Sequence, residues 1–387
     1  MQTIKDKFGW LVGPFTIASL WYGIYIGPGF AGGAQIVSYF VGQGWLGVFI
    51  GPIITSLVAS TLCFLVLEYS RTFELYNFRA FYDGVYGKFK LFFANVKEFS
   101  AMLACITISA LSFATGGRLI AELIHVNYII AGLVTIGIIA ILIICGQSIV
   151  LKSSSLITIA LVSLLIYIGI RGIAPSWDSM VKFTSKKVIT TTYKDAWIKI
   201  ILYINIMVAF IDAAIPSSKG VVKTKRDSIA SAIIGGTLVL CSTIMMTIMF
   251  SAGMPDVVGV DMPTVWSLEH IIGAGFSIKL IYTTIAYLAV ISTGAGYLYG
   301  MAERYQVVLN KIWKNSSYQA RRITLVIMLV CLGIYFGRMG IPDLVTKAYG
   351  IIGRINIPLF ELPFLVILPY QIAKYKKTNS KTSLTNL

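Results

Sequence analysis

The side chains of this chain most able to do chemistry are ionisable or hydroxyl-bearing residues inside long apolar runs. Asp212 directly follows such a run, which ends near Phe210. An ionisable side chain at membrane depth is costly and is usually functional. We therefore expect Asp212 to meet a substrate ammonium group, to assist a bound cation or to carry a proton. A structural ion pair with Arg118, or a cap on the half-helix that follows, is the alternative.

Two apolar runs are interrupted by residues that weaken a helix. The first contains Gly27-Pro28-Gly29-Phe30-Ala31-Gly32-Gly33, and the second contains Ile211-Asp212-Ala213-Ala214-Ile215-Pro216-Ser217-Ser218. Proline removes a backbone donor and glycine relaxes the chain, so both stretches should unwind. Unwound backbone at membrane depth needs protein or a wet cavity around it, and paired breaks point to a transporter binding site. Close packing of helices at the glycines is the alternative.

Helices inside a membrane must position these residues. Of the 387 residues, 57% are hydrophobic and 12% are charged, whereas soluble domains contain about 25% charged residues. The apolar runs are continuous rather than alternating, which excludes a spanning β-barrel. We place spans near 11–41, 44–68, 96–122, 127–146, 148–171, 197–218, 228–252, 275–302, 320–337 and 355–372.

This pattern predicts an all-α polytopic membrane protein with about ten transmembrane helices. Because the breaks fall in spans one and six, those spans have opposite orientations, as in a five-plus-five inverted repeat with discontinuous helices 1 and 6. We predict a first repeat over 1–173, a second repeat over 174–372 and a basic cytoplasmic tail over 373–387.

The basic residues indicate topology rather than nucleic-acid binding. The net charge is +16, but the 32 Lys and Arg lie mainly in loops between spans. Most of them fall in cytoplasmic segments if the N-terminus is inside. We predict a multi-pass protein of the cell (inner) membrane with both termini cytoplasmic. Its partners are then the lipid bilayer and a small-molecule substrate, with no nucleic acid.

Neither an enzyme nor a transition-metal site is indicated. The chain has no GxxxxGK[ST], HExxH or GxSxG motif. Its five cysteines lie in apolar runs without CxxC spacing, and His125 and His270 are far apart. No second carboxylate is expected near Asp212, so we predict no cofactor other than a coupling ion.

The segment Tyr25-Ile26-Gly27-Pro28-Gly29-Phe30-Ala31-Gly32-Gly33-Ala34-Gln35-Ile36 resembles the YkvI-like family of membrane transporters, whose first span carries a similar GxGFAxG motif. Arg79-Ala80-Phe81-Tyr82-Asp83-Gly84-Val85-Tyr86-Gly87 resembles that family's short inner-loop segment. The family belongs to the amino acid–polyamine–organocation superfamily, which implies the leucine-transporter type of fold. Where the family usually has Gln-Glu after the glycines, this chain has Ala34-Gln35, so a proton-carrying carboxylate is missing there.

The resemblance also implies a sodium site. In the leucine-transporter fold, carbonyls of the first break combine with a carbonyl and two adjacent hydroxyls of span eight. The matching residues here are Gly23, Ile26, Ala289, Ser292 and Thr293. The alternative is that both hydroxyls bond to carbonyls of their own helix. Phe30 stands where a second sodium site would need a polar side chain, so one ion at most is expected. A lysine could replace sodium, and Lys152 is the candidate.

Together these features predict a secondary active transporter that carries an amino acid or a related amine by alternating access. Coupling to Na⁺ is favoured over coupling to H⁺. The short helix after the first break should direct its N–H groups at a substrate carboxylate. The alternative is a ligand-sensing membrane receptor of the germinant-receptor type. The candidate substrate-binding residues are Gly27, Gly29, Phe30, Gly32, Gln35, Ser109, Phe113, Phe210 and Asp212.

Overall fold

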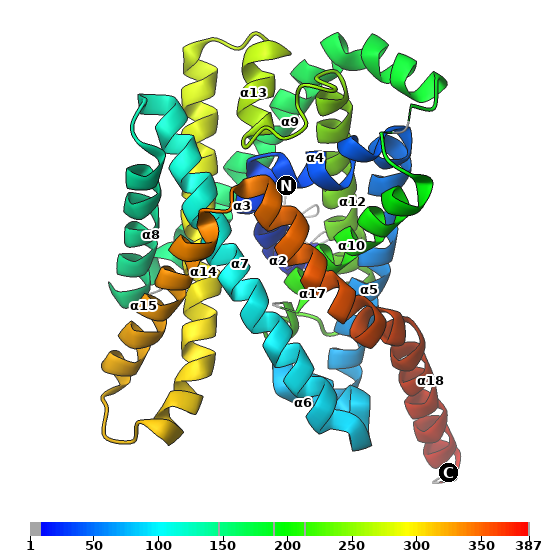
Figure 1. The fold of residues 1–387 in the computed structure, drawn as a ribbon. Coiled ribbons are helices and arrows are strands. Elements are labelled where there is room, and N and C mark those ends of the chain that lie inside the picture. Colours follow the sequence, from blue (N-terminus) through cyan, green and yellow to red (C-terminus); the bar gives the residue numbers. More distant parts are fainter. Residues whose placement is uncertain (1–8, 146–147, 189, 213, 386–387) are drawn as a thin grey trace.

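The computed structural model describes residues 9–145, 148–188, 190–212 and 214–385, and every regular element in these ranges is helical (Figure 1). The α-helices are α2 (Val12–Tyr25), α3 (Pro28–Ala31), α4 (Ala34–Tyr39), α5 (Gly51–Phe73), α6 (Phe78–Tyr86), α7 (Lys90–Ile124), α8 (Tyr128–Cys145), α9 (Ser148–Ser185), α10 (Tyr193–Ile211), α11 (Ala214–Ser217), α12 (Lys225–Ser251), α13 (Pro263–His270), α14 (Phe276–Ile312), α15 (Tyr318–Gly337), α16 (Ile341–Asp343), α17 (Tyr349–Asn356) and α18 (Leu362–Thr385). Shorter 3-10 or π turns are η1 (Gly9–Leu11), η2 (Val41–Gln43), η3 (Leu46–Ile50), η4 (Gly87–Phe89), η5 (Leu344–Ala348) and η6 (Ile357–Glu361).

The helices follow the predicted spans. Within the described ranges, seven helices are long and apolar enough to cross a membrane, and Tyr128–Ile144 is a shorter apolar helix. The two spans with internal breaks are divided among α2, α3 and α4 and between α10 and α11. The chain is therefore a polytopic, all-helical membrane protein, as the apolar runs predict. The boundary at residue 173 falls inside α9, and the residue bounds of the two repeats stay a prediction.

Glycine and proline residues interrupt the helix at the first break. The helix α2 ends at Tyr25, and α3 begins at Pro28, the position at which a missing N–H costs least. Gly33 then adopts φ 86°, a left-handed conformation that favours glycine, before α4 begins. A Cβ on Gly33 would lie 2.7 Å from the Thr264 hydroxyl, so α13 also requires a glycine there.

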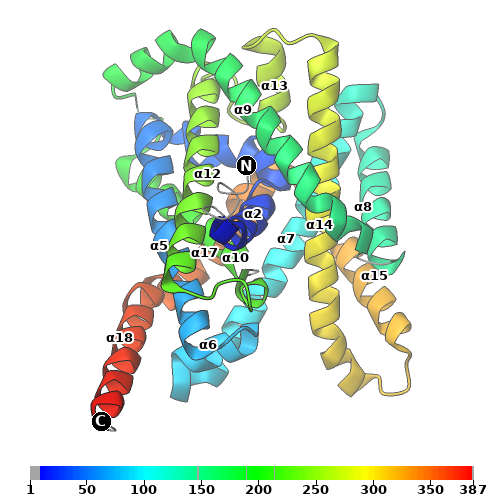
Figure 2. The same cartoon turned by 180° about the vertical axis from the view of Figure 1, so that it is seen from behind.

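The bundle consists of two groups of helices with α2 between them. In one group α7 packs against α8, α14 and α15, and in the other α12 packs against α2, α5 and α9. Figure 2 shows α8, α14 and α15 on one side of α2 and α5 and α12 on the other. We call the two ends of the bundle the α13 end and the α18 end, after the helices seen there at the top and bottom of Figure 1. The short helix α6 also lies at the α18 end.

Candidate functional site

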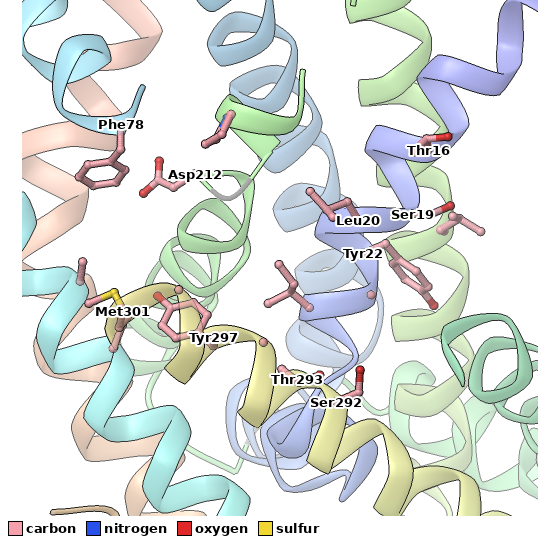
Figure 3. Close-up of a pocket in the computed structure, with 18 of the residues that line it drawn as sticks. Thr16, Ser19, Leu20, Tyr22, Phe78, Asp212, Ser292, Thr293, Tyr297 and Met301 are labelled. Carbon is pink, nitrogen blue, oxygen red and sulfur yellow. The ribbon is translucent and has the colours of Figure 1, made fainter. Parts of the chain in front are cut away.

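A cavity of about 770 Å³ lies beside both breaks (Figure 3). It is lined by α2, by the first half of α7, by the second half of α14 and by the residues of the second break. These parts of α7 and α14 run towards the α18 end. The polar and charged lining residues are Thr16, Ser19, Lys97, Ser100, Ser163, Asp212, Ser292, Thr293, Arg304 and Asn356.

Part of the predicted sodium set meets on this cavity. Gly23, Ser292 and Thr293 all line it. Gly27 packs so closely on α14 that an added Cβ would lie 2.9 Å from the Thr293 methyl carbon. Ile26 and Ala289 are buried but do not line the cavity. The first break and the hydroxyl pair of α14 are therefore neighbours, and the binding of an ion by them stays a prediction.

Asp212 pairs with Lys97 of α7. The Lys97 Nζ lies 3.0 Å from Asp212 Oδ2, and the Tyr82 hydroxyl of α6 donates to Asp212 Oδ1 over 2.8 Å. The Lys97 ammonium also lies 5.1 Å from the centre of the Phe360 ring. The alternative pair of Asp212 with Arg118 is wrong, because Arg118 is bonded to Asp261 instead.

The Lys97–Asp212 pair is almost fully removed from solvent. The side chains are 4% and 11% exposed. A buried charge without a partner is strongly destabilising, so each of these residues requires the other for as long as both are charged. From the sequence, Lys97 lies at the very start of the predicted span 96–122, is counted with the cytoplasmic lysines and carries no role. The missing signal is its place in α7, which begins seven residues earlier, at Lys90.

A second carboxyl group lies close to this pair, contrary to the sequence prediction. Glu361, at the end of η6, interacts electrostatically with both Lys97 and Asp212. It is 3% exposed. The described residues contain no cluster of three or more His, Cys, Asp or Glu side chains that could hold a metal ion.

The first break is covered on the side of the α13 end. The Thr264 N–H of α13 donates to the Gly32 carbonyl over 3.1 Å, and the Tyr282 hydroxyl donates to the Ala31 carbonyl. The Arg118 guanidinium lies 2.8 Å from Asp261, which joins α7 to the segment before α13. The cavity and these closing contacts therefore lie on opposite sides of the first break.

The other candidates at the first break are buried and do not line the cavity. They are Gly27, Gly29, Phe30, Gly32 and Gln35. The Phe30 ring packs 4.8 Å from the ring of Tyr25. The Gln35 side chain faces Gly29, and within the described residues its amide nitrogen has no hydrogen-bond partner.

Two candidates on α7 lie elsewhere. The Ser109 hydroxyl donates to the Leu329 carbonyl of α15 over 3.1 Å. Phe113 packs against Tyr128 at the start of α8 and against Gly337 at the end of α15. Both side chains hold helices together and do not line the cavity. The side chains of Phe210 and Lys152 lie outside the described part of the structure.

Comparison with solved structures identifies the fold. Mhp1, a nucleobase-cation-symport-1 family transporter solved with bromovinylhydantoin bound, is 14% identical, with a TM-score of 0.57 over 89% of this chain and 78% of that chain. MhsT in complex with L-phenylalanine is 12% identical, with a TM-score of 0.58 over 94% and 97%. The Eremococcus coleocola manganese transporter is 15% identical, with a TM-score of 0.56 over 92% and 78%.

These neighbours are transporters with the leucine-transporter type of fold. The chain has this fold, with the five-plus-five inverted repeat and the discontinuous helices 1 and 6 that the sequence predicts. No protein-family model matches the chain, and no curated protein matches it.

Proposed function

We propose that this protein is a secondary active transporter that carries an amino acid or a related amine by alternating access. One observation carries the proposal: both broken helices contribute to one cavity that is covered on its other side by α13 and the Arg118–Asp261 pair. A site reachable from one side only is what alternating access requires of each end state. The cavity volume of about 770 Å³ is in the range of small-molecule sites.

The lining supports a substrate that carries charge of both signs. The residues that line the cavity include Asp212, Lys97 and Arg304, whose side chains carry charges of both signs; Lys97 is paired with Asp212, and Arg304 with Glu98. The ammonium group of an amino acid could pair with Asp212, and its carboxylate could pair with Lys97 or Arg304. The solved neighbour that contains L-phenylalanine agrees with this substrate class, but its low identity leaves the assignment a proposal.

Sodium is our proposed coupling ion. The proposed ligands are the Gly23, Ile26 and Ala289 carbonyls and the Ser292 and Thr293 hydroxyls. The support is the common cavity of Gly23 with the hydroxyl pair and the contact of Gly27 with Thr293. A further neighbour of similar fold is described as a Na⁺-coupled sialic acid symporter, with 12% identity and a TM-score of 0.51 over 93% of this chain and 85% of that chain.

We also propose the orientation and the family. We place the α18 end and both termini on the cytoplasmic side of the cell membrane. In this orientation most basic loop residues obey the positive-inside rule. The cavity-lining parts of α7 and α14 then run towards the cytoplasm, and we propose that this is an inward-facing state. Membership of the YkvI-like family is supported by the motif of residues 25–36, which forms the first break.

Uptake by proteoliposomes tests the proposal. A panel of labelled amino acids and amines is offered with an inward Na⁺ gradient, and with K⁺ in place of Na⁺ as the reference. We expect accumulation of one solute class that depends on Na⁺. The double substitution of Ser292→Ala with Thr293→Ala should abolish that dependence, whereas the control of Thr16→Ala with Ser19→Ala, on hydroxyls of the same cavity, should keep it.

Each contrary result has its own meaning. Na⁺ dependence that persists in the Ser292→Ala, Thr293→Ala variant contradicts the sodium site. Binding of a solute without accumulation under any gradient contradicts the transporter and supports the receptor of the germinant-receptor type.

A further inference from the structure

Glu361 is a buried carboxyl group without a donor. It ends η6, between α17 and α18, and the residue is 3% exposed. In the described part of the chain neither of its two oxygens has a hydrogen-bond partner. Transfer of a carboxylate out of water without hydrogen bonds costs many kcal/mol, and such a group takes up a proton instead. The surroundings of Glu361 therefore favour its neutral acid.

The charged and titratable groups that face Glu361 come from three elements. Lys97 of α7 and Asp212 beyond α10 interact with it electrostatically, as does Tyr82 of α6. Tyr86 of α6 is bonded beside it, to the Leu359 carbonyl over 2.6 Å. The Tyr82 hydroxyl is already used on Asp212. Lys97 is therefore the donor in this group that can move to Glu361.

Lys97 lies where its ammonium group could pair with either Asp212 or Glu361. Its Nζ is 3.0 Å from Asp212 Oδ2 and 5.1 Å from the ring centre of Phe360, the residue before Glu361. It is also 5.5 Å from the ring centre of Tyr82. A flexible four-carbon side chain with three donors can turn within such a pocket. Lys97 thus pairs with Asp212 and also interacts electrostatically with Glu361.

We propose that Glu361 is a proton-binding group that competes with Asp212 for Lys97. When Glu361 is protonated, Lys97 pairs with Asp212, as observed. When the O–H bond of Glu361 breaks, its proton passes to the solvent, and Lys97 moves to the new carboxylate. Asp212 is then left with the Tyr82 hydroxyl alone and can accept another cation.

The charges of Lys97, Asp212 and Glu361 allow one proton to be exchanged for one cation without a change in net charge. When Glu361 is neutral, the charges of Lys97 and Asp212 sum to zero. After loss of the proton the three groups carry one negative charge, and one Na⁺ or one substrate ammonium group restores neutrality. The proton site thus links release of one proton to uptake of one cation. The identity of that cation depends on the proposed function, whereas the proton site itself does not.

Infrared spectroscopy tests the proton site without substrate. The purified full-length protein is placed in phosphatidylcholine vesicles with K⁺ as the only alkali cation, and pH-difference spectra are recorded. A protonated carboxyl group gives a C=O stretching band that an ionised one lacks. We expect such a band at neutral pH that disappears as the pH rises. In a Glu122→Gln background, which removes another half-buried carboxyl group, it should be lost in Glu361→Gln and kept in Glu74→Gln, a control on an exposed carboxyl group just beyond α5.

Two further substitutions should move the titration midpoint in opposite directions. Lys97→Met removes the cation that stabilises the carboxylate, so the midpoint should rise by roughly 1–3 pH units. Asp212→Asn removes a like charge and releases Lys97, so the midpoint should fall. A merely structural Glu361 would show neither shift.

The outcomes separate this proposal from the proposed function. Persistence of the band in Glu361→Gln, or unchanged midpoints in both the Lys97 and Asp212 variants, overturns the proton site. If Glu361→Gln does not fold, the opposite shifts decide the question alone. Because no substrate or sodium is present, a failure here leaves the uptake experiment standing, and a failure of uptake leaves the proton site standing.

Discussion

The Arg118 guanidinium and the Asp261 carboxylate lie 2.8 Å apart, and this ion pair joins α7 to the segment that leads into α13. Arg118 also lies 4.4 Å from the centre of the Tyr128 ring at the start of α8. The pair is on the side of the first break opposite the cavity, next to the bond from Thr264 to the Gly32 carbonyl. In the proposed cycle these contacts must separate whenever the site opens at the α13 end.

We predict that Arg118→Gln shifts the protein away from the state described here. The side chains of this pair are 40% and 27% exposed, so the pair contributes at most about 1 kcal/mol, or a five-fold change in the ratio of two conformations. The readout is thiol labelling at Gly300→Cys in a cysteine-free background, since Gly300 lines the cavity and a Cβ there meets no atom within 4 Å.

Labelling should become slower in Arg118→Gln. It should not change in Lys347→Gln, which breaks an exposed pair with Asp343 within one segment. Equal labelling in all three proteins would show that the Arg118 pair has no part in closing the α13 end.

A second prediction concerns the contact between the first break and α14. A Cβ at position 27 would lie 2.9 Å from both the Ile24 carbonyl oxygen and the Thr293 methyl carbon. Gly27→Ala should therefore push α14 away, at a cost of about 1–3 kcal/mol. Thermal denaturation with Na⁺ or K⁺ is the measurement. The variant should lose any stabilisation specific to Na⁺, whereas Gly300→Ala should keep it; retained Na⁺ stabilisation in Gly27→Ala would argue against this sodium site.

The third prediction concerns the Lys97–Asp212 pair. Lys97→Met leaves the Asp212 carboxylate without its cation in a buried place, and loss of one partner of a buried pair costs about 3–5 kcal/mol. Addition of Asp212→Asn removes the remaining charge and should recover most of that loss. Denaturant unfolding of both variants tests this. A double variant less stable than Lys97→Met would mean that the charge on Asp212 has another partner.

The fourth prediction concerns the α18 end. Glu68 of α5 is 1% exposed and accepts hydrogen bonds from Arg71, Ser228 and Lys376, the last on α18. Hydrogen bonds to a charged group contribute about 1.5–3 kcal/mol, so Glu68→Gln should lower the free energy of unfolding by that amount.

Lys376→Ala should cost much less, because the Lys376 side chain is 51% exposed and the solvent screens it. Glu74→Gln, on an exposed residue just beyond α5, is the matched control. Thermal denaturation compares the stabilities of the Glu68, Lys376 and Glu74 variants. Equal losses in the Glu68 and Lys376 variants would mean that the tail helix, rather than the buried carboxylate, determines the stability of this end.

The spans and their breaks could be predicted because local chemistry determines them. A long apolar run must form a helix in lipid, and Gly27 to Gly33 cannot continue one easily. The partners of Asp212 could not be predicted in this way. Lys97 and Arg118 are both on α7, 21 residues or roughly 31 Å apart at 1.5 Å per residue. Which of them meets Asp212 depends on how α7 and α10 are aligned, and a single sequence does not contain that alignment.

Glu361 could have been found with a rule already applied. It lies inside the predicted span 355–372, as Asp212 lies inside the span 197–218, and an ionisable side chain within a span is a functional candidate. Ser109 and Phe113 are the opposite case. Their residue types suit a binding pocket, but the rotation of α7 turns them towards α8 and α15.

The pairing of Lys97 with Asp212 also has a consequence for the effect of membrane voltage on the proposed transporter. One elementary charge moved across the membrane changes energy by about 2.3 kcal/mol per 100 mV. Because the charges of this pair cancel, the site without a bound cation presents no net charge to the field as the helices rearrange. In the proposed exchange the site loses the Glu361 proton and gains one cation, so the loaded site is neutral as well. Voltage should therefore have little effect on either step of the proposed cycle.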